Sequence, residues 1–420
     1  MKAILTSCLA ALFLLSAGLA GAQIINPKKV LERKVTNKTN QVINKKAGEV
    51  VDSAFGVKKE PTTKKEPGSK TDTTVNPSQG NEPSLQTYSK FDFVPGEKVL
   101  FFDDFSQDAV GDFPAAWNTN GSAEVVTTNL FPGNWMKFVM HECVWTDALL
   151  TLPDNYTIEF DVIPLGGLEG AGMSGWQMRL MQAKNAKAWD HGSAPGKGGF
   201  KFHLEYFGRP GYSTWLYGEE CEPAHLSGNI EDENMKQKMN QKYHISIWVQ
   251  KTRIRLYQDQ HKMIDLPKAF PAGCVKPDRL RFEYGAAMIS NVRIAVGAPD
   301  MRNKLLTEGK LVTYGIYFDV NKDVVKPESY GTLKSIADVL KENPDVKIKI
   351  IGHTDADGND ASNLDLSKRR ALAVKNELVK NFGIDAARMD TDGKGETQPI
   401  APNDNPSNKA LNRRVELIKQ

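Results

Sequence analysis

A chain of 420 residues has room for two or three domains, each with its own hydrophobic core. Its formal net charge of +3 is too small to indicate a nucleic-acid-binding protein. Four cysteines in such a length also exclude a fold built on a framework of disulfides.

The N-terminus has the features of a signal peptide over residues 1–22. Lys2 supplies a positive charge, residues 4–19 form an apolar run that is short for a membrane span, and Ala20-Gly21-Ala22 has the small residues of a cleavage site. We therefore expect an exported protein whose mature chain starts at Gln23. Export argues further against a nucleic-acid partner.

The remaining cysteines leave the disulfide pairing open. Cys8 is removed with the signal peptide, so Cys143, Cys221 and Cys274 remain. An odd set allows at most one disulfide within the chain, and small buried thiols are the simpler alternative.

Residues 23–90 are basic and polar and have almost no aromatic side chains. Such a segment buries too little apolar surface to offset the entropy of ordering it, so we predict a largely disordered tether. Apolar residues at helical spacing over 28–55 predict an amphipathic helix in it. That helix would rest on an anionic membrane surface or a partner, or it would be a solvated helix within a linker.

Residues 91–300 contain all seven tryptophans and are predicted to form an antiparallel β-sandwich. Apolar residues alternate with polar ones over 156–162 and 244–249, and a polar turn at 250–253 indicates a hairpin that returns through Ile254 and Leu256. Further strands are expected over 200–206, 279–284 and 292–296.

The start of this region resembles a concanavalin-like or laminin-G-like jelly roll. The resemblance is carried by Val99-Leu100-Phe101-Phe102-Asp103-Asp104-Phe105, by Gly111-Asp112-Phe113-Pro114 and by Trp117. Hydrolases of this fold carry the motif Glu-x-Asp-x-x-Glu. Glu159 and Asp161 match its first two acids, but Pro164 stands in place of the third. We interpret the two acids as the outward charged face of a half-buried strand.

Residues 301–420 change to a pattern of alternating strands and helices, which predicts a compact α/β domain. Strands are expected over 314–320, 346–351 and 415–418. One helix is expected from Pro327 to about Asn343, and a second from Ser362 to near Gly383.

The C-terminal domain contains a series of residues at spacings that resemble the OmpA-like domain shared with the Pal and MotB groups. These are Gly352-His353-Thr354-Asp355, Gly358, Asn363, Leu366-Ser367, Arg370-Ala371, Gly395-Glu396 and Asn412-Arg413-Arg414-Val415-Glu416. The resemblance covers the whole domain and implies noncovalent binding of peptidoglycan.

Asp355 and Arg370 are the central pair of the predicted site. Asp355 follows a buried strand and Arg370 lies in the next helix, so the intervening loop brings both to one cleft. A carboxylate for an ammonium group and an Arg fork for a carboxylate suit a zwitterion. The resemblance implies that the zwitterion is the end of the diaminopimelate side chain in a stem peptide. The alternative is an internal salt bridge between Asp355 and Arg370.

Other residues of the motif are assigned by resemblance to the same cleft. Phe318 and Asp319 would border it, and Thr354 would shape its loop. Asn363 would either brace the second helix or touch the ligand. Of Arg413 and Arg414, one would reach the cleft and the other would be structural. Gly352, Gly358 and Gly395 are expected to permit turns.

The sequence thus predicts a non-enzymatic protein of a Gram-negative periplasm, associated with the outer membrane and the cell wall. It would bind peptidoglycan and link the wall to the outer membrane or to a glycan or protein ligand of the sandwich. No cofactor and no metal are predicted. Two alternatives remain, in which the sandwich is a glycan-binding module with exposed tryptophans or a wall-localised glycoside hydrolase.

Overall fold

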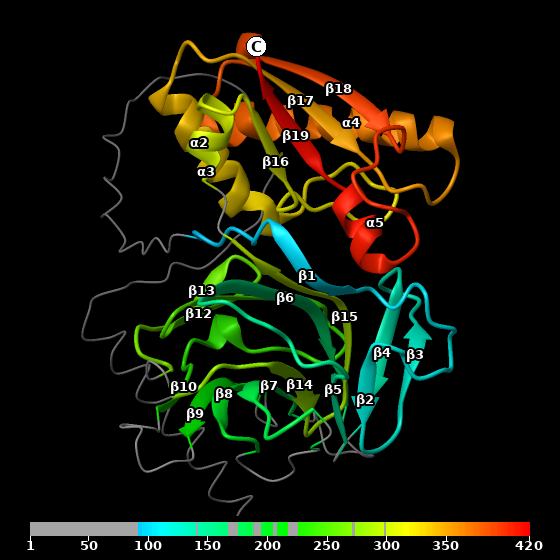
Figure 1. Cartoon of the computed structure of the whole chain (residues 1–420), viewed down its shortest axis with the longest axis vertical. Coiled ribbons are helices and arrows are strands. Elements are labelled where there is room, and N and C mark those ends of the chain that lie inside the picture. The colour runs from blue at the N-terminus through cyan, green and yellow to red at the C-terminus, as the bar shows by residue number, and fades with distance from the viewer. Residues whose placement is uncertain are drawn as a thin grey trace, which may run out of the picture. The chain divides into compact units, whose positions relative to one another are not determined.

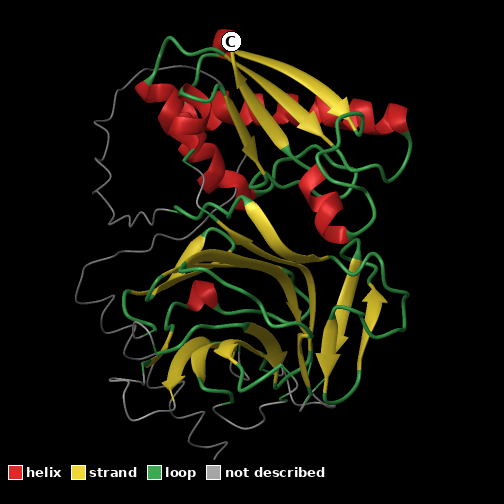
Figure 2. Cartoon of the chain, in the orientation of Figure 1, coloured by secondary structure: helices red, strands yellow, loops and turns green. Residues whose placement is uncertain are grey.

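The computed structural model describes residues 91–139, 142–166, 175–186, 188, 195–204, 208–216, 226–270, 274–297 and 300–420. The predicted signal peptide, tether and helix over 28–55 lie outside these residues. The described residues all belong to one compact unit. Along the chain, this unit contains a β-sandwich and then an α/β domain, called here the C-terminal domain (Figures 1 and 2).

The sandwich has two antiparallel sheets, which confirms the predicted fold. In the described residues, the first sheet has eight strands: β1 (Lys98–Asp103), β3 (Ala123–Thr127), β4 (Asn134–Phe138), β6 (Asn155–Pro164), β11 (Tyr243–Gln250), β12 (Arg253–Gln258), β13 (His261–Leu266) and β15 (Ala287–Val296). The second has seven: β2 (Trp117–Thr119), β5 (Cys143–Thr146), β7 (Gln177–Gln182), β8 (Gly198–Leu204), β9 (Pro210–Leu216), β10 (Ser227–Asn229) and β14 (Arg279–Glu283). Figure 1 shows the two sheets face to face.

Alternation along the strands decides which side chains enter the space between the sheets. On β6, Ile158, Phe160 and Val162 lie in this core, as the period of two predicts. The predicted hairpin is formed by β11 and β12, with Ile247 opposite Leu256. Trp248 points to the other face, where it is half-buried beneath the guanidinium of Arg255, 4.9 Å from the ring centroid.

Two of the three mature cysteines are described. Cys143 is a free, buried thiol on β5. Cys274 is disulfide-bonded, to a partner outside the described residues.

The C-terminal domain is a sheet of four strands with helices packed on it, as the predicted α/β pattern requires. The strand order is β16 (Lys310–Thr313), β19 (Val415–Lys419), β17 (Ile348–His353) and β18 (Met389–Gly395), and β17 and β18 are parallel. The helices are α2 (Met301–Leu306), α3 (Tyr330–Glu342), α4 (Asp360–Phe382) and α5 (Pro406–Asn412). Short 3-10 turns lie at Glu233–Met235 in the sandwich and at Pro327–Ser329 and Ala386–Arg388 in this domain. No helix of the described residues is long and apolar enough to cross a membrane.

Helix α4 was predicted two residues too late at its start. Its first residue is Asp360, because the side chain of Asn359 accepts hydrogen bonds from the amides of Ala361 and Ser362 and so caps the helix. At its other end Gly383 has φ of 70°, the left-handed conformation that glycine adopts without strain.

The strand predicted over 314–320 is wrong. The strand of this region is β16, which ends at Thr313. After it, the backbone amide of Tyr317 donates to the Ser329 side chain, and the Tyr317 carbonyl accepts from the amide of Lys326. The apolar run therefore pairs with the segment that leads into α3 instead of joining the sheet.

The outer face of β6 carries charge but does not face solvent, contrary to the prediction. Glu159 is 2% exposed and Asp161 is 3% exposed. Glu159 accepts from Arg293 at 3.0 Å and from the hydroxyl of Tyr317 in the C-terminal domain at 2.6 Å. Asp161 lies 2.7 Å from Nδ1 of His244. This face of the sandwich is therefore covered and its charges are paired.

His244 is the cation that these carboxylates hold in place. Burial by itself lowers the pKa of His244, but the hydrogen bond to Asp161 and the nearby carboxylate of Glu159, 3.6 Å from Nε2, outweigh burial and raise the pKa to about 10. The pKa of Asp161 is held well below its usual range, because Lys326, His244 and Lys242 outweigh the burial that would raise it.

Stability should therefore fall as the pH rises. The folded pKa of His244 lies above the value of about 6.5 of an unfolded chain. The stabilisation it contributes is complete below pH 6.5 and is lost as the pH approaches 10. We expect the free energy of unfolding of the wild type, from urea titrations, to drop by a few kcal/mol between pH 6.5 and 10. The variant His244→Gln serves as the control, and equal pH profiles for the two proteins would contradict the assignment.

A second contact between the two domains depends on a glycine. A Cβ at Gly331, in the first turn of α3, would overlap the carbonyl oxygen of Phe93, which precedes the sandwich. We expect Gly331→Ala to lower the free energy of unfolding by about 1–3 kcal/mol, although alanine favours helices. Lys341→Ala, at an exposed position of the same helix, should change it by less than about 0.5 kcal/mol. A Gly331→Ala protein as stable as the wild type would show that α3 and Phe93 are not in tight contact.

Candidate functional site

Asp355 lies at the carboxyl end of β17, in the loop that leads to α4. The loop starts with Thr354, which is buried and whose amide donates to the carbonyl of Gly395 at 3.0 Å. One carboxylate oxygen of Asp355 accepts from the amide of Asp357 at 3.3 Å. The other lies 2.6 Å from Nη1 of Arg413. The position of Asp355 at the end of β17 and these two contacts hold its carboxylate in place.

Asn363 braces the loop rather than facing an open cleft. It is 6% exposed, and its Nδ2 lies within 3.4 Å of the carbonyl oxygen of Asp355, 3.1 Å of that of Asp357 and 2.5 Å of the Glu396 carboxylate. Of the two roles predicted for Asn363, the geometry matches the structural one. Glu396, from the Gly395-Glu396 part of the motif, belongs to the same hydrogen-bonded group through its contact with Asn363.

Two of the three motif glycines have left-handed backbone conformations that favour glycine. Gly358 has φ of 103° and Gly395 has φ of 52°. Gly352 lies within β17 instead of a turn, and a Cβ there would overlap the carbonyl of Ser367 on α4. Its role is to let the strand and the helix approach closely.

Arg370 is held by backbone carbonyls and by an aromatic ring. Its Nε donates to the carbonyl of Lys322 at 3.0 Å and its Nη2 to that of Asp319 at 3.2 Å. The guanidinium carbon lies 4.9 Å from the ring centroid of Phe318. Burial lowers the pKa of Arg370 to about 10, and nearby Asp355 opposes that shift. The group remains a cation at neutral pH.

No carboxylate of the described residues forms a salt bridge with Arg370. Among the described residues, Nη1 and the second hydrogen of Nη2 have no hydrogen-bond acceptor. Asp355 pairs with Arg413, so the internal Asp355–Arg370 salt bridge considered as an alternative is not formed.

Phe318 and Asp319 border Arg370 from the segment before α3. Phe318 supplies its ring, and its backbone forms an isolated bridge with Val325. Asp319 supplies its carbonyl, whereas its carboxylate lies 3.2 Å from Lys322 and is 40% exposed. The sequence singled out Asp319 for its acid, but the structure uses its backbone.

Arg413 and Arg414 take different positions. Arg413 follows α5, lies against Asp355 and keeps a third of its side chain exposed, 34%. Arg414 is 2% exposed and pairs with Glu416 at 2.9 Å. Arg413 thus lies beside Asp355 near the surface, and Arg414 is part of the domain's interior. Because the two arginines are adjacent in the motif, the sequence could not show which of them lies beside Asp355.

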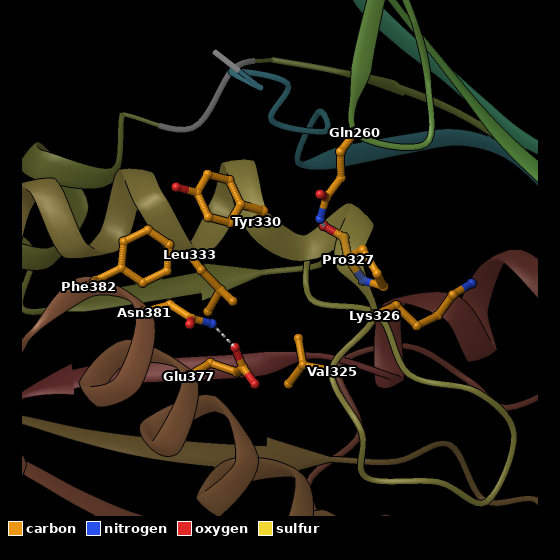
Figure 3. Close-up of a pocket in the computed structure, with 9 residues that line it drawn as sticks. All are labelled: Gln260, Val325, Lys326, Pro327, Tyr330, Leu333, Glu377, Asn381 and Phe382. Carbon is orange, nitrogen blue, oxygen red and sulfur yellow. Dashed lines mark hydrogen bonds between the residues drawn. The ribbon is translucent and has the colours of Figure 1, made fainter. Parts of the chain in front are cut away.

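A pocket of the described residues lies elsewhere. Its volume is about 220 Å³, and it is lined by Gln260, Val325, Lys326, Pro327, Tyr330, Leu333, Glu377, Asn381 and Phe382 (Figure 3). Glu377 and Asn381 are hydrogen-bonded to each other. Asn381 is roughly 16 Å along α4 from Arg370 at the helical rise per residue. The apolar part of this pocket belongs to the domain core, and it brings together none of the predicted site residues.

The comparisons with known proteins point to the same residues. Residues 317–413 match the model of the OmpA family, a range that starts beside Phe318 and ends at Arg413. Residues 317–413 thus form an OmpA-family domain. Within this OmpA-family domain lie Asp355, Arg370 and their neighbours.

Relatives resemble the OmpA-family domain and not the whole chain. Outer membrane porin F of Pseudomonas aeruginosa is 42% identical over 105 residues, which are 25% of this chain and 30% of the porin. The peptidoglycan-binding protein ArfA of Mycobacterium bovis is 40% identical over 92 residues, 22% of this chain and 28% of ArfA. The crystal structure of the peptidoglycan-associated lipoprotein from Burkholderia pseudomallei is 31% identical, with a TM-score of 0.25, and covers 29% of this chain and 100% of that one. The chain therefore spans less than a third of the two sequence relatives.

The two arginines of the OmpA-family domain should differ in their effect on stability. We expect Arg414→Gln to lower the free energy of unfolding by about 1–3 kcal/mol, because it removes the buried cation beside the carboxylate of Glu416 and leaves only Lys310, which is 48% exposed. Arg413→Gln should cost less than about 1 kcal/mol, because its ion pair is partly exposed. Denaturant titrations of the two variants measure the difference. Equal losses would contradict the separation of a cleft arginine from an interior one.

Proposed function

We propose that this protein binds peptidoglycan noncovalently through its OmpA-family domain and has no enzymatic role. The observation that carries the proposal is that a loop carboxylate, Asp355, lies close enough to Arg370 to affect its charge without forming a salt bridge with it, and that the outer edge of Arg370 has no partner among the described residues. The match of residues 317–413 to the OmpA family and the likeness to a peptidoglycan-binding relative support it.

The ligand that suits this arrangement is the zwitterionic end of diaminopimelate in a stem peptide. Arg370 would receive its carboxylate through two parallel N–H donors. Asp355 would receive its ammonium group and would give up part of its bond to Arg413 in doing so. Both groups are fixed before binding, Arg370 by carbonyls and Asp355 by the end of β17, so little entropy is lost when the ligand arrives.

The location follows from the same proposal. A signal peptide over residues 1–22 exports the chain to the periplasm, where the wall lies next to the outer membrane. The protein would be associated with both in a Gram-negative envelope, and the name of the porin relative is consistent with this. Domains over 91–300 and 301–420, joined to a tether over 23–90, would link the wall to the membrane or to a partner of the sandwich.

Neither alternative for the sandwich receives support from the described residues. Five tryptophans are buried, namely Trp117, Trp135, Trp145, Trp176 and Trp215, and Trp248 is covered by Arg255. Trp189 lies outside the described residues. Glu159 and Asp161 are buried in ion pairs, so they are not placed as the acids of a hydrolase.

Co-sedimentation of the full chain with peptidoglycan sacculi that contain diaminopimelate tests the proposal. We expect the wild type to pellet with the wall. Asp355→Ala and Arg370→Ala should each weaken binding about tenfold or more, because each removes a charge-assisted contact to the ligand. Free diaminopimelate should release the wild type from the sacculi.

The matched controls are Asp365→Ala and Arg369→Ala. These residues form an exposed salt bridge on α4, the helix that carries Arg370, with 66% and 43% of their side chains exposed. Both control variants should bind as the wild type does, and circular dichroism should show all four variants to be folded. A wild type that stays in solution, or site variants that pellet as the controls do, would overturn the proposal.

A further inference from the structure

A contact between the sandwich and the OmpA-family domain lies directly beside the proposed site. Strand β1 of the sandwich packs against α5. The Ser407 hydroxyl donates to the carbonyl of Phe102 at 3.3 Å. The guanidinium carbon of Arg413 lies 5.4 Å from the ring centroid of Phe102. The end of β1 therefore lies next to Arg413.

Arg413 is shared between two carboxylates, one from each domain. Nη1 lies 2.6 Å from Oδ2 of Asp355, and Nη2 lies 3.6 Å from Oδ2 of Asp104. Asp104 follows β1 and is 20% exposed, and its other oxygen accepts from the amide of Ser106 at 3.1 Å. That bond directs Oδ2 of Asp104 toward Arg413.

Asp104 adds a negative charge beside Arg413. Asp355 and Asp104 are two anions, and Arg413 and Arg370 are two cations. The neighbouring pair of Lys409 and Asp357, 2.8 Å apart, cancels itself. A zwitterionic ligand adds no net charge. Removing the charge of Asp104 would make the surroundings of Arg413 more positive, which disfavours the approach of an ammonium group.

We propose that Asp104 is a positioning residue of the peptidoglycan site, which retains Arg413 when Asp355 turns to the ammonium group of the ligand. This inference rests on the proposed function. Asp355 cannot serve Arg413 and an incoming ammonium equally well, because both compete for the same carboxylate oxygens. Asp104 supplies Arg413 with a second carboxylate and so lowers the cost of that exchange. The sandwich thereby contributes one residue to a site whose ligand contacts come from the OmpA-family domain.

The test compares two soluble ligands on the full chain by isothermal titration calorimetry. Diaminopimelate carries ammonium and carboxylate groups, whereas pimelate has the same chain length and only carboxylates. We expect Asp104→Asn to weaken diaminopimelate binding by about three- to tenfold. Its affinity for pimelate should stay unchanged or rise, because the site becomes more positive.

The control is Asp112→Asn, which makes the same change of charge at an exposed position of the segment after β1. It should bind both ligands as the wild type does. A second comparison uses Arg413→Gln, since Asp104 is argued to act through Arg413. In the Arg413→Gln background, adding Asp104→Asn should produce no further loss of diaminopimelate binding.

The outcomes separate the inference from the proposed function. If the wild type binds neither sacculi nor diaminopimelate, the proposed function fails. If Asp355→Ala abolishes binding while Asp104→Asn binds as Asp112→Asn does, the function stands and the role of Asp104 is wrong. Equal losses for diaminopimelate and pimelate would also overturn the inference, because they indicate a purely structural effect. Additive losses in the Arg413→Gln background would do the same.

Discussion

Burial of charge on the outer face of β6 is the constraint on which the arrangement of the described residues depends. Glu159 and Asp161 are both almost fully buried, and an unpaired carboxylate in that position costs several kcal/mol. Arg293 and His244 supply cations from neighbouring strands, and Tyr317 supplies a hydroxyl from the OmpA-family domain. Glu159 therefore has both of its hydrogen-bond donors, Arg293 and Tyr317, only when the OmpA-family domain is packed against the sandwich.

The packing of the sandwich on the OmpA-family domain also places sandwich residues next to the proposed site. The covered face of β6 and the packing of β1 on α5 belong to the same junction, and β1 carries Asp104 to Arg413. An OmpA-family domain in another chain would have different neighbours at this place. The surroundings of Arg413 are thus a property of this combination of domains, and fold alone would not reveal them.

The site itself is held mainly by elements that do not move with the ligand. Asp355 ends a strand, Asn363 fastens the loop behind it, and Arg370 is bonded to two carbonyls and lies over Phe318. Side chains locked in this way keep their geometry before binding, which favours affinity and selectivity. In the proposed binding mode, the exchange of partners at Asp355 is the one change.

The sequence by itself determined the two fold types, because strand and helix periodicities are local and report which face of each element is buried. It also determined the motif that contains Asp355 and Arg370. The sequence pattern did not predict the conformation of residues 314–320, since the backbone hydrogen bonds of Tyr317 are made with residues just before α3 and not with a strand. The short elements β18 and α5 carry too little apolar pattern to be recognised. Only the tertiary structure decided that Arg413 rather than Arg370 pairs with Asp355, and that Asp104 joins them, because residues far apart in the chain meet there through packing between domains.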